Sequence, residues 1–163
     1  MSYIGTILAY SIIAVVVVGI GMYGDYTHTI EINADTQDTP WIKDIINNTD
    51  SNLTKKINSI SIVNQSVVGS LCESLAISSV DGSLWWGSVG CTVSNIAGST
   101  FLDADIYIAD KPAFEGMSTT QQFTLYHEIG HVYNMYYGIR DTERDADNYA
   151  EVHIRNPNLH SNS

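Results

Sequence analysis

Basic residues are scarce in this sequence of 163 residues. Seven Lys and Arg residues stand against 18 Asp and Glu residues, which gives a formal net charge of -11 at pH 7. Affinity for nucleic acid depends on Lys and Arg side chains that neutralise phosphates, and attachment to anionic lipid depends on the same residues. The composition therefore predicts that nucleic acid is not a partner, and it leaves the oligomeric state open.

Charge of either sign is absent from Ile4–Met22, a run of 19 residues. A helix of this length rises about 1.5 Å per residue and spans the ~30 Å hydrocarbon core of a bilayer. Tyr3 and Tyr23 flank the run where interfacial aromatic residues usually lie, and no Lys or Arg precedes Lys43. We predict that residues 1–24 form a single-pass membrane anchor with the following domain outside the cytoplasm. A cleaved signal peptide, which would leave a secreted domain, is the alternative.

Cysteine occurs only twice, as Cys72 and Cys91. In an exported domain, an even pair most simply forms one disulfide, worth about 3 kcal/mol in the chain-entropy model. The alternative is two unpaired, buried thiols. Three sequons place candidate N-glycosylation sites at Asn47, Asn52 and Asn64. A disulfide and glycans would both agree with an extracytoplasmic domain.

Short strands alternate with helices after the apolar run, so the sequence predicts one α+β domain over residues 25–163. β-branched residues in near period-two order indicate strands. Pro40 in a first helical turn, followed by an apolar stripe over residues 41–46, indicates a helix that starts near Thr39. The predicted strands are Tyr26–Ala34, Ile57–Val63, Ser74–Ser78, Gly90–Ser94 and Ala104–Asp110.

The sequence HEIGH contains His127, Glu128 and His131 and lies in a segment that predicts a helix over Thr120–Tyr137. The segment has no proline and ends before Gly138, a residue suited to a left-handed helix cap. Residues four apart project side by side from a helix, so the two histidines can bind one ion. Neutral imidazole is a zinc ligand, and Glu128 lies close enough to act as the general base on a zinc-activated water.

A catalytic zinc site needs three protein ligands and one open position, so a third ligand should follow. The sequence ERDAD begins at Glu143, twelve residues after His131. Asp141 or Thr142 can cap a second helix there, with acidic residues in its first turn. We expect Glu143 to be the third ligand. Asp147 shares its helical face and can accept the free ring N–H of a zinc-bound histidine.

The combination of HEIGH and ERDADNYA resembles the gluzincins, the thermolysin-like zinc peptidases, and in particular the branch whose second helix reads E-x-x-A-D-x-F/Y-A. The resemblance implies a small zincin-like domain, in which a mixed sheet carries an active-site helix and a second, ligand-bearing helix. It implies that His127, His131 and Glu143 hold Zn2+. It also implies that Glu128 is the catalytic base and that Asp147 orients a ligand histidine.

Two further parts of a gluzincin site have candidates in the sequence. The resemblance implies an edge strand beside the active-site helix that pairs with extended substrate, and Ala104–Asp110 occupies the matching place. The group that stabilises the oxyanion has His153 and Tyr133 as candidates. Tyrosines at helical spacing are more often packing residues, which is the competing interpretation of Tyr133.

The donor set has one open alternative and one that is excluded. An aspartate ligand, Asp141 or Asp145, could replace Glu143. The zincin class with a third histidine six residues after the second is excluded, because Tyr137 holds that position. The cysteines do not have the spacing or neighbours of a Cys-based metal site.

These observations predict a zinc-dependent endopeptidase that hydrolyses a peptide or protein substrate with metal-activated water. The alternative from another class is a non-catalytic surface protein, structural or binding, that is membrane-anchored and retains a zincin fold. Glu128 favours the enzyme, because a binding protein has no need of a base. A surface protein with a chance HExxH match would leave Glu143 and Asp147 unexplained.

Overall fold

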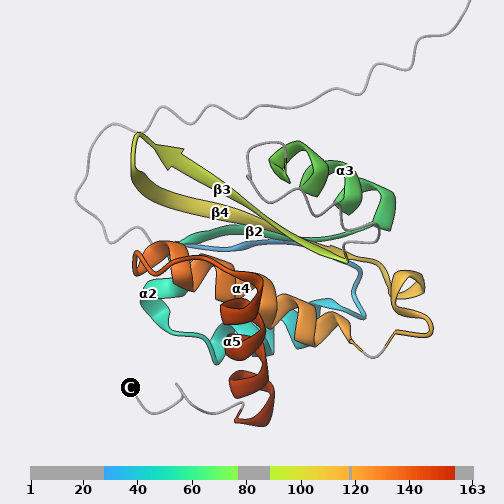
Figure 1. Ribbon diagram of the computed structural model, residues 1–163. Helices are drawn as coiled ribbons and strands as arrows, with labels where there is room; N and C mark the ends of the chain where they lie inside the picture. Colours follow the sequence, from blue (N-terminus) through green and yellow to red (C-terminus); the bar gives the residue numbers. More distant parts are fainter. Residues whose placement is uncertain (1–27, 77–88, 118, 157–163) are drawn as a thin grey trace, which may run out of the picture.

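The computed structural model describes residues 28–76, 89–117 and 119–156. Over these residues the chain is an α+β domain with a mixed four-stranded sheet and five α-helices (Figure 1). No helix among them is long and apolar enough to cross a membrane. The apolar run Ile4–Met22 lies outside the described residues, so the membrane anchor stays a prediction.

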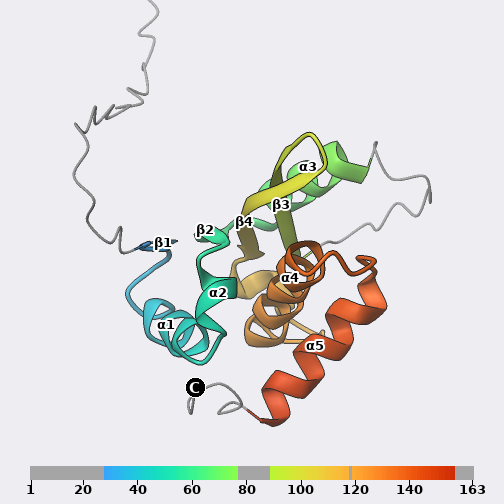
Figure 2. The same ribbon diagram turned by 90° about the vertical axis from the view of Figure 1, so that its left-hand side faces the viewer.

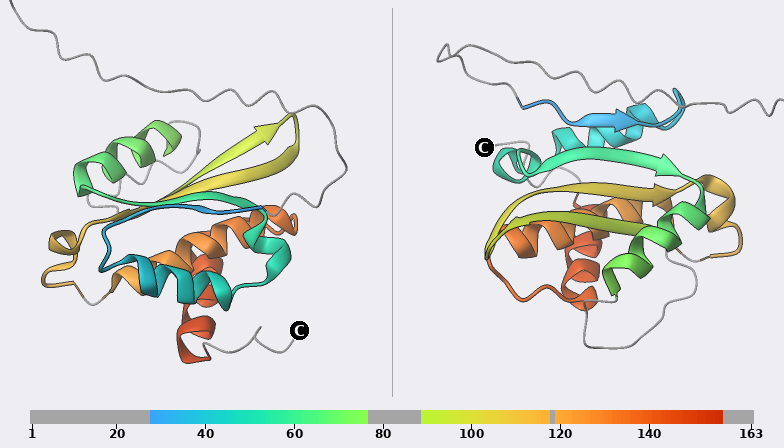
Figure 3. Two further views of the ribbon diagram at one scale, coloured as in Figure 1. Left: turned by 180° about the vertical axis from the view of Figure 1, so that it is seen from behind. Right: turned by 90° about the horizontal axis from the view of Figure 1, so that it is seen from above.

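The sheet has the strand order β1-β2-β4-β3, which the view from above shows (Figure 3). Strands β1 (Glu31–Asn33), β2 (Ile57–Val63) and β4 (Thr100–Ala109) are parallel, whereas β3 (Gly90–Ala97) pairs antiparallel with β4. The expectation that Ala104–Asp110 is an edge strand is therefore wrong, because β4 has a neighbour on each side. Among the residues that the structure describes, the edge strand that contacts helix α4 (Gln121–Tyr136) is β3.

Helices cover both faces of the sheet. Helix α3 lies on one face, and α4 crosses the other face with α1 and α2 next to it (Figures 1 and 2). Helix α5 packs on α4, on the side away from the sheet (Figure 2). The bounds are α1 Thr39–Asn47, α2 Ser51–Thr54, α3 Gln65–Ala76, α4 Gln121–Tyr136 and α5 Glu143–Arg155, and a 3-10 turn Lys111–Phe114 follows β4.

The hydrophobic core lies between the sheet and α4. Ile60 of β2 and Ile106 and Ile108 of β4 are fully buried, and they pack in one cluster with Leu125 and Ile129 of α4. Alternate strand residues point to opposite faces of a sheet, so this isoleucine face is continuous across β2 and β4. The packing fixes α4 on the sheet, and the histidine face of α4 is thereby fixed as well.

The ends of α4 and α5 agree with the sequence prediction. The hydroxyl of Thr120 accepts a hydrogen bond from the backbone N–H of Phe123, and that of Thr142 accepts one from Asp145, so both threonines are N-caps. Gly138 has φ 65°, the left-handed conformation expected after α4. These caps define the length of the turn that returns α5 to α4.

Helix α3, like the short helix α2 and the 3-10 turn, was not predicted from the sequence. The predicted strand Ser74–Ser78 is wrong over the part that the structure describes, because residues as far as Ala76 are helical. Gly69 and Ser70, which are weaker helix formers than alanine, lie inside the helix and resemble turn residues. Val68 is fully buried against the sheet, so tertiary packing outweighs local propensity here.

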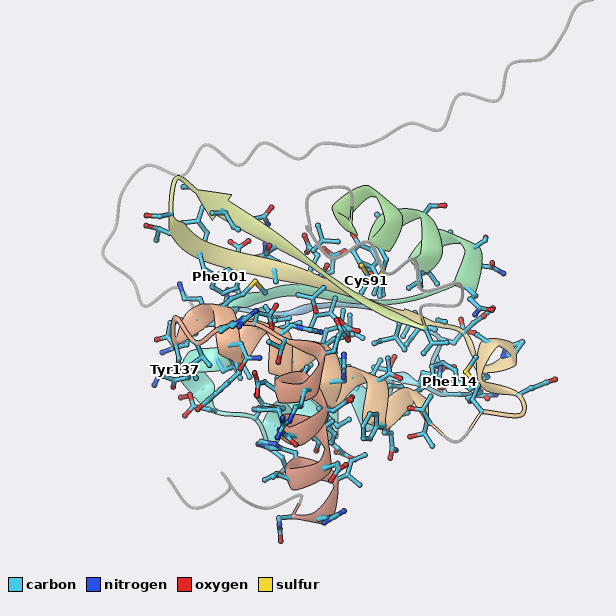
Figure 4. The ribbon with its side chains drawn as sticks, viewed as in Figure 1. Cys91, Phe101, Phe114 and Tyr137 are labelled. Atoms are coloured by element: carbon cyan, nitrogen blue, oxygen red, sulfur yellow. The ribbon has the colours of Figure 1, made fainter. Side chains whose placement is uncertain are left out.

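Cys72 of α3 and Cys91 of β3 meet between the helix and the sheet, where Figure 4 labels Cys91. The structure contains no disulfide among the residues that it describes, and Cys91 is buried. The hydrogen bond with Cys72 raises the pKa of the Cys91 thiol, and burial raises it further. The two thiol groups are therefore neighbours joined by a hydrogen bond, and the disulfide stays a prediction.

The three candidate glycosylation sites are all on the surface. Asn47, Asn52 and Asn64 are exposed, as an acceptor asparagine must be. Asn64 also caps α3, because its Oδ1 accepts a hydrogen bond of 3.0 Å from the backbone N–H of Ser66. Glycosylation at these positions stays a prediction.

Helices α4 and α5 approach each other closely at Gly130 and Ala146. A Cβ atom placed on Gly130 would lie 2.9 Å from Ala146 Cα and 3.1 Å from Ala146 O. These atoms belong to the backbone and can move only with the whole of α5. Because Ala146 and Ala150 are fully buried, small residues on both helices maintain this approach.

We expect Gly130→Ala to lower the free energy of unfolding by about 1 to 3 kcal/mol, because the added methyl group overlaps the backbone of α5. The higher helix propensity of alanine offsets at most about 1 kcal/mol. Urea unfolding of the purified chain measures the change. Gly69→Ala is the matched control on α3, since no atom lies within 4 Å of its added methyl group. A loss of stability as large in the control would contradict the expectation.

Candidate metal centre

His127 and His131 lie one turn apart on α4 and direct their Nε2 atoms toward the same point. The two Nε2 atoms are 3.1 Å apart, and the ring planes meet at 78°. Two Zn–N bonds of about 2.0 to 2.1 Å at a tetrahedral angle would place the nitrogens about 3.3 Å apart. The arrangement of the two rings therefore fits a single zinc ion.

Glu143 of α5 completes the set of converging donor atoms. Its Oε2 is 3.2 Å from Nε2 of His127, and its Oε1 is 3.7 Å from Nε2 of His131. One ligand atom from each of the three residues lies within 4.8 Å of the other two. Two imidazoles and one carboxylate are a donor set that zinc takes in catalytic sites. The side chain of Glu143 is 75% exposed, so the centre opens to solvent on this side.

Each histidine is held from behind by an aspartate. Asp147 Oδ1 is 2.8 Å from His127 Nδ1, and Asp141 Oδ1 is 2.8 Å from His131 Nδ1. Asn134 also donates a hydrogen bond of 3.1 Å to Asp141. When Nδ1 donates its proton to a carboxylate, Nε2 keeps a lone pair for a metal, so these contacts orient both rings for binding.

The sequence predicts the observed role for Asp147 but a different role for Asp141. The structure places Asp147 where the helical spacing predicted it. The sequence offers Asp141 as an alternative metal ligand to Glu143. In the structure, Asp141 instead makes the same orienting contact to His131 that Asp147 makes to His127. Asp145, the other alternative, accepts a hydrogen bond of 2.6 Å from the Thr142 hydroxyl and serves the N-cap of α5.

The carboxylates around His127 and His131 favour a positive charge on the two imidazole rings. Burial alone would lower the pKa of His131, but the hydrogen bond with Asp141 and the charges of Glu128, Asp141 and Glu143 outweigh it and raise the pKa to about 9. The pKa of His127 is also raised, because its hydrogen bond with Glu143 and nearby negative charge outweigh burial. At neutral pH a ring proton supplies the positive charge that a metal ion would bring.

Glu128 lies beside the histidines but faces the sheet. It is 5% exposed, and burial raises the pKa of its carboxyl group, although the charges of His131 and His127 oppose the shift. The hydroxyl of Thr92 on β3 donates a hydrogen bond of 2.8 Å to Glu128 Oε2. Sequence reasoning missed Thr92, because 36 residues separate the partners and no motif marks the contact.

His153 and Tyr133, the candidates for oxyanion stabilisation, lie in an aromatic cluster between α4 and α5. The ring of His153 stacks on Tyr149 at 3.9 Å and on Tyr126 at 5.7 Å, and its Nδ1 is 2.7 Å from the Tyr149 carbonyl oxygen. Tyr133 contacts the rings of Tyr137 and Tyr149. These contacts are those of packing residues, and they do not support the oxyanion role.

Comparison with known proteins gives no relative of this chain. No family model, no curated protein and no solved structure matches the chain.

We expect Asp141→Asn to weaken zinc binding by about tenfold, at the low end of the effect of losing an orienting partner. The amide keeps the shape and an acceptor for the His131 N–H, but it lacks the negative charge. Competition with a chromophoric chelator measures the affinity. Asp44→Asn on the exposed side of α1 is the control with the same change of charge. Equal affinities of the two variants would contradict the role of Asp141.

Zinc binding at pH 7.5 should release at least about one proton per ion. His131, with a pKa of about 9, is mostly protonated at this pH and must lose the proton before Nε2 can bind zinc. The zinc affinity should therefore rise with pH and level off above about pH 9. Calorimetry in buffers of different ionisation enthalpy counts the protons. Binding without proton release would show that the histidines are neutral beforehand.

Proposed function

We propose that the chain is a zinc-dependent endopeptidase of the gluzincin type, attached to a membrane by residues 1–24 and active outside the cytoplasm. The convergence of His127, His131 and Glu143 from two crossing helices carries the proposal. An orienting carboxylate behind each ring supports zinc binding, and the adjacent Glu128 supports hydrolysis. The membrane attachment rests on the sequence alone.

The residues of the centre have separate roles in peptide hydrolysis. A zinc ion held by the three ligands would be a Lewis acid, able to lower the pKa of water toward 7 and to polarise a carbonyl group. Asp141 and Asp147 keep the histidine rings in the tautomer that binds through Nε2. Glu128 accepts a proton from the attacking water and passes it to the leaving amine nitrogen, a role suited to a carboxyl group whose pKa is raised.

The sheet edge next to the centre supports a peptide as the substrate. Within residues 28–76, 89–117 and 119–156, strand β3 has a strand neighbour only on the β4 side, and it contacts α4. An edge strand presents unpaired backbone N–H and C=O groups, which an extended peptide can join by strand addition. In the gluzincins that the sequence resembles, an edge strand beside the active-site helix has this role. We assign it to β3.

The full-length chain should contain about one zinc ion, and His131→Ala should lose it, because two ligands do not retain the metal. Glu128→Gln should keep the zinc but cleave dye-labelled casein at least about 100-fold more slowly, because the amide cannot accept the proton. Elemental analysis and a fluorescence assay measure the two properties. The Glu128 variant thus separates metal binding from catalysis.

Two outcomes would contradict the proposal in different ways. A folded wild-type chain that does not bind zinc would reject the metal centre itself. A wild-type chain that binds zinc tightly but cleaves no peptide or protein substrate would instead favour the non-catalytic surface protein.

A further inference from the structure

Strand β3 passes over α4 at the position of the candidate base. The Thr92 hydroxyl lies 2.8 Å from Glu128 Oε2 and 3.1 Å from the Glu128 carbonyl oxygen. Neighbouring strand residues alternate between the two faces of the sheet, and Cys91 faces α3 (Figure 4). Gly90 and Thr92 therefore share the face toward α4. Two residues of β3, Gly90 and Thr92, thus contact the Glu128 carboxylate from the side of the sheet.

Gly90 gives the carboxylate its space. A Cβ atom at this position would overlap Glu128 Oε1, at 2.4 Å, and Thr124 Cγ2, at 2.5 Å. Any other residue here would displace the Glu128 side chain or move β3 away from α4. The absence of a side chain at Gly90 is therefore a condition for the observed position of the carboxylate.

The two carboxylate oxygens of Glu128 differ in their partners. Oε2 accepts the hydrogen bond from Thr92, whereas Oε1 accepts none from the residues that the structure describes. An oxygen that is already hydrogen-bonded is restrained in position, and the other oxygen keeps its lone pairs for a proton. The contact therefore distinguishes the oxygen that Thr92 holds, Oε2, from the other oxygen, Oε1.

We propose that Thr92 is a positioning residue for peptide hydrolysis, which anchors Oε2 of Glu128 so that Oε1 receives the proton of the attacking water. The inference rests on the proposed function. In the step, the water oxygen bonds to the peptide carbonyl carbon while its proton moves to Oε1. The proton then passes to the amide nitrogen as the C–N bond breaks, which yields a carboxylic acid and an amine. Thr92 takes no proton and acts only through Glu128.

The test compares Thr92→Val, which keeps the branched shape but lacks the hydroxyl group, with Thr92→Ser, which keeps the hydroxyl group. In the full-length zinc-loaded chain, Thr92→Val should lower kcat for dye-labelled casein by about 10- to 100-fold, because a misplaced base reacts slowly. KM and zinc content should not change, since no ligand is touched. Thr92→Ser should recover most of the rate. Thr100→Val on the exposed part of β4 is the matched control and should match the wild type.

A second measurement does not depend on activity. Thr92→Val should lower the urea midpoint of the wild-type chain, and by less in a Glu128→Ala background, where the carboxylate partner is already gone. Equal shifts of the urea midpoint in the two backgrounds would show that Thr92 does not interact with the Glu128 carboxylate. An active enzyme whose kcat does not change in Thr92→Val would overturn the positioning role alone. A zinc-loaded wild type without activity would overturn the proposed function and the role of Thr92 with it.

Discussion

The approach of two backbones at Gly130 and Ala146 determines where the candidate ligands meet. Helix α4 is fixed on the sheet by its isoleucine and leucine contacts, but α5 has no sheet beneath it and depends on α4 for its position. A larger residue at the crossing would separate the helices, and the first turn of α5 would withdraw from the histidines. The carboxylate of Glu143 reaches both rings because the crossing is tight.

Electrostatics and packing act in opposite directions at this centre. Burial disfavours charge on the two imidazoles, yet three carboxylates, Asp141, Glu143 and Asp147, lie within contact distance of them. The net result is that the histidines retain protons more strongly than they would in water. The fold thus builds a negatively charged environment around the rings, which favours a positive charge there.

The sequence predicts most of the centre because helical periodicity is a local property. The spacing of His127 and His131, and of Glu143 and Asp147, places each pair on one face, and the short turn between the helices leaves little freedom. The edge strand and Thr92 could not be predicted in this way. Their positions depend on which strand of the β3–β4 pair is the neighbour of β2 and which lies at the edge, and contacts between distant parts of the chain decide this.

The ligands and their orienting aspartates all belong to one continuous segment, residues 127–147, whereas the hydrogen bond to Glu128 Oε2 comes from a strand 36 residues earlier. Contacts that are local in sequence form early and quickly, and contacts between distant segments form late. The small sequence separation therefore favours early formation of the contacts among the candidate metal donors of α4 and α5. The contact of Thr92 with the proposed base spans a much larger sequence separation, so the same principle places its formation after that of the contacts among the candidate metal donors.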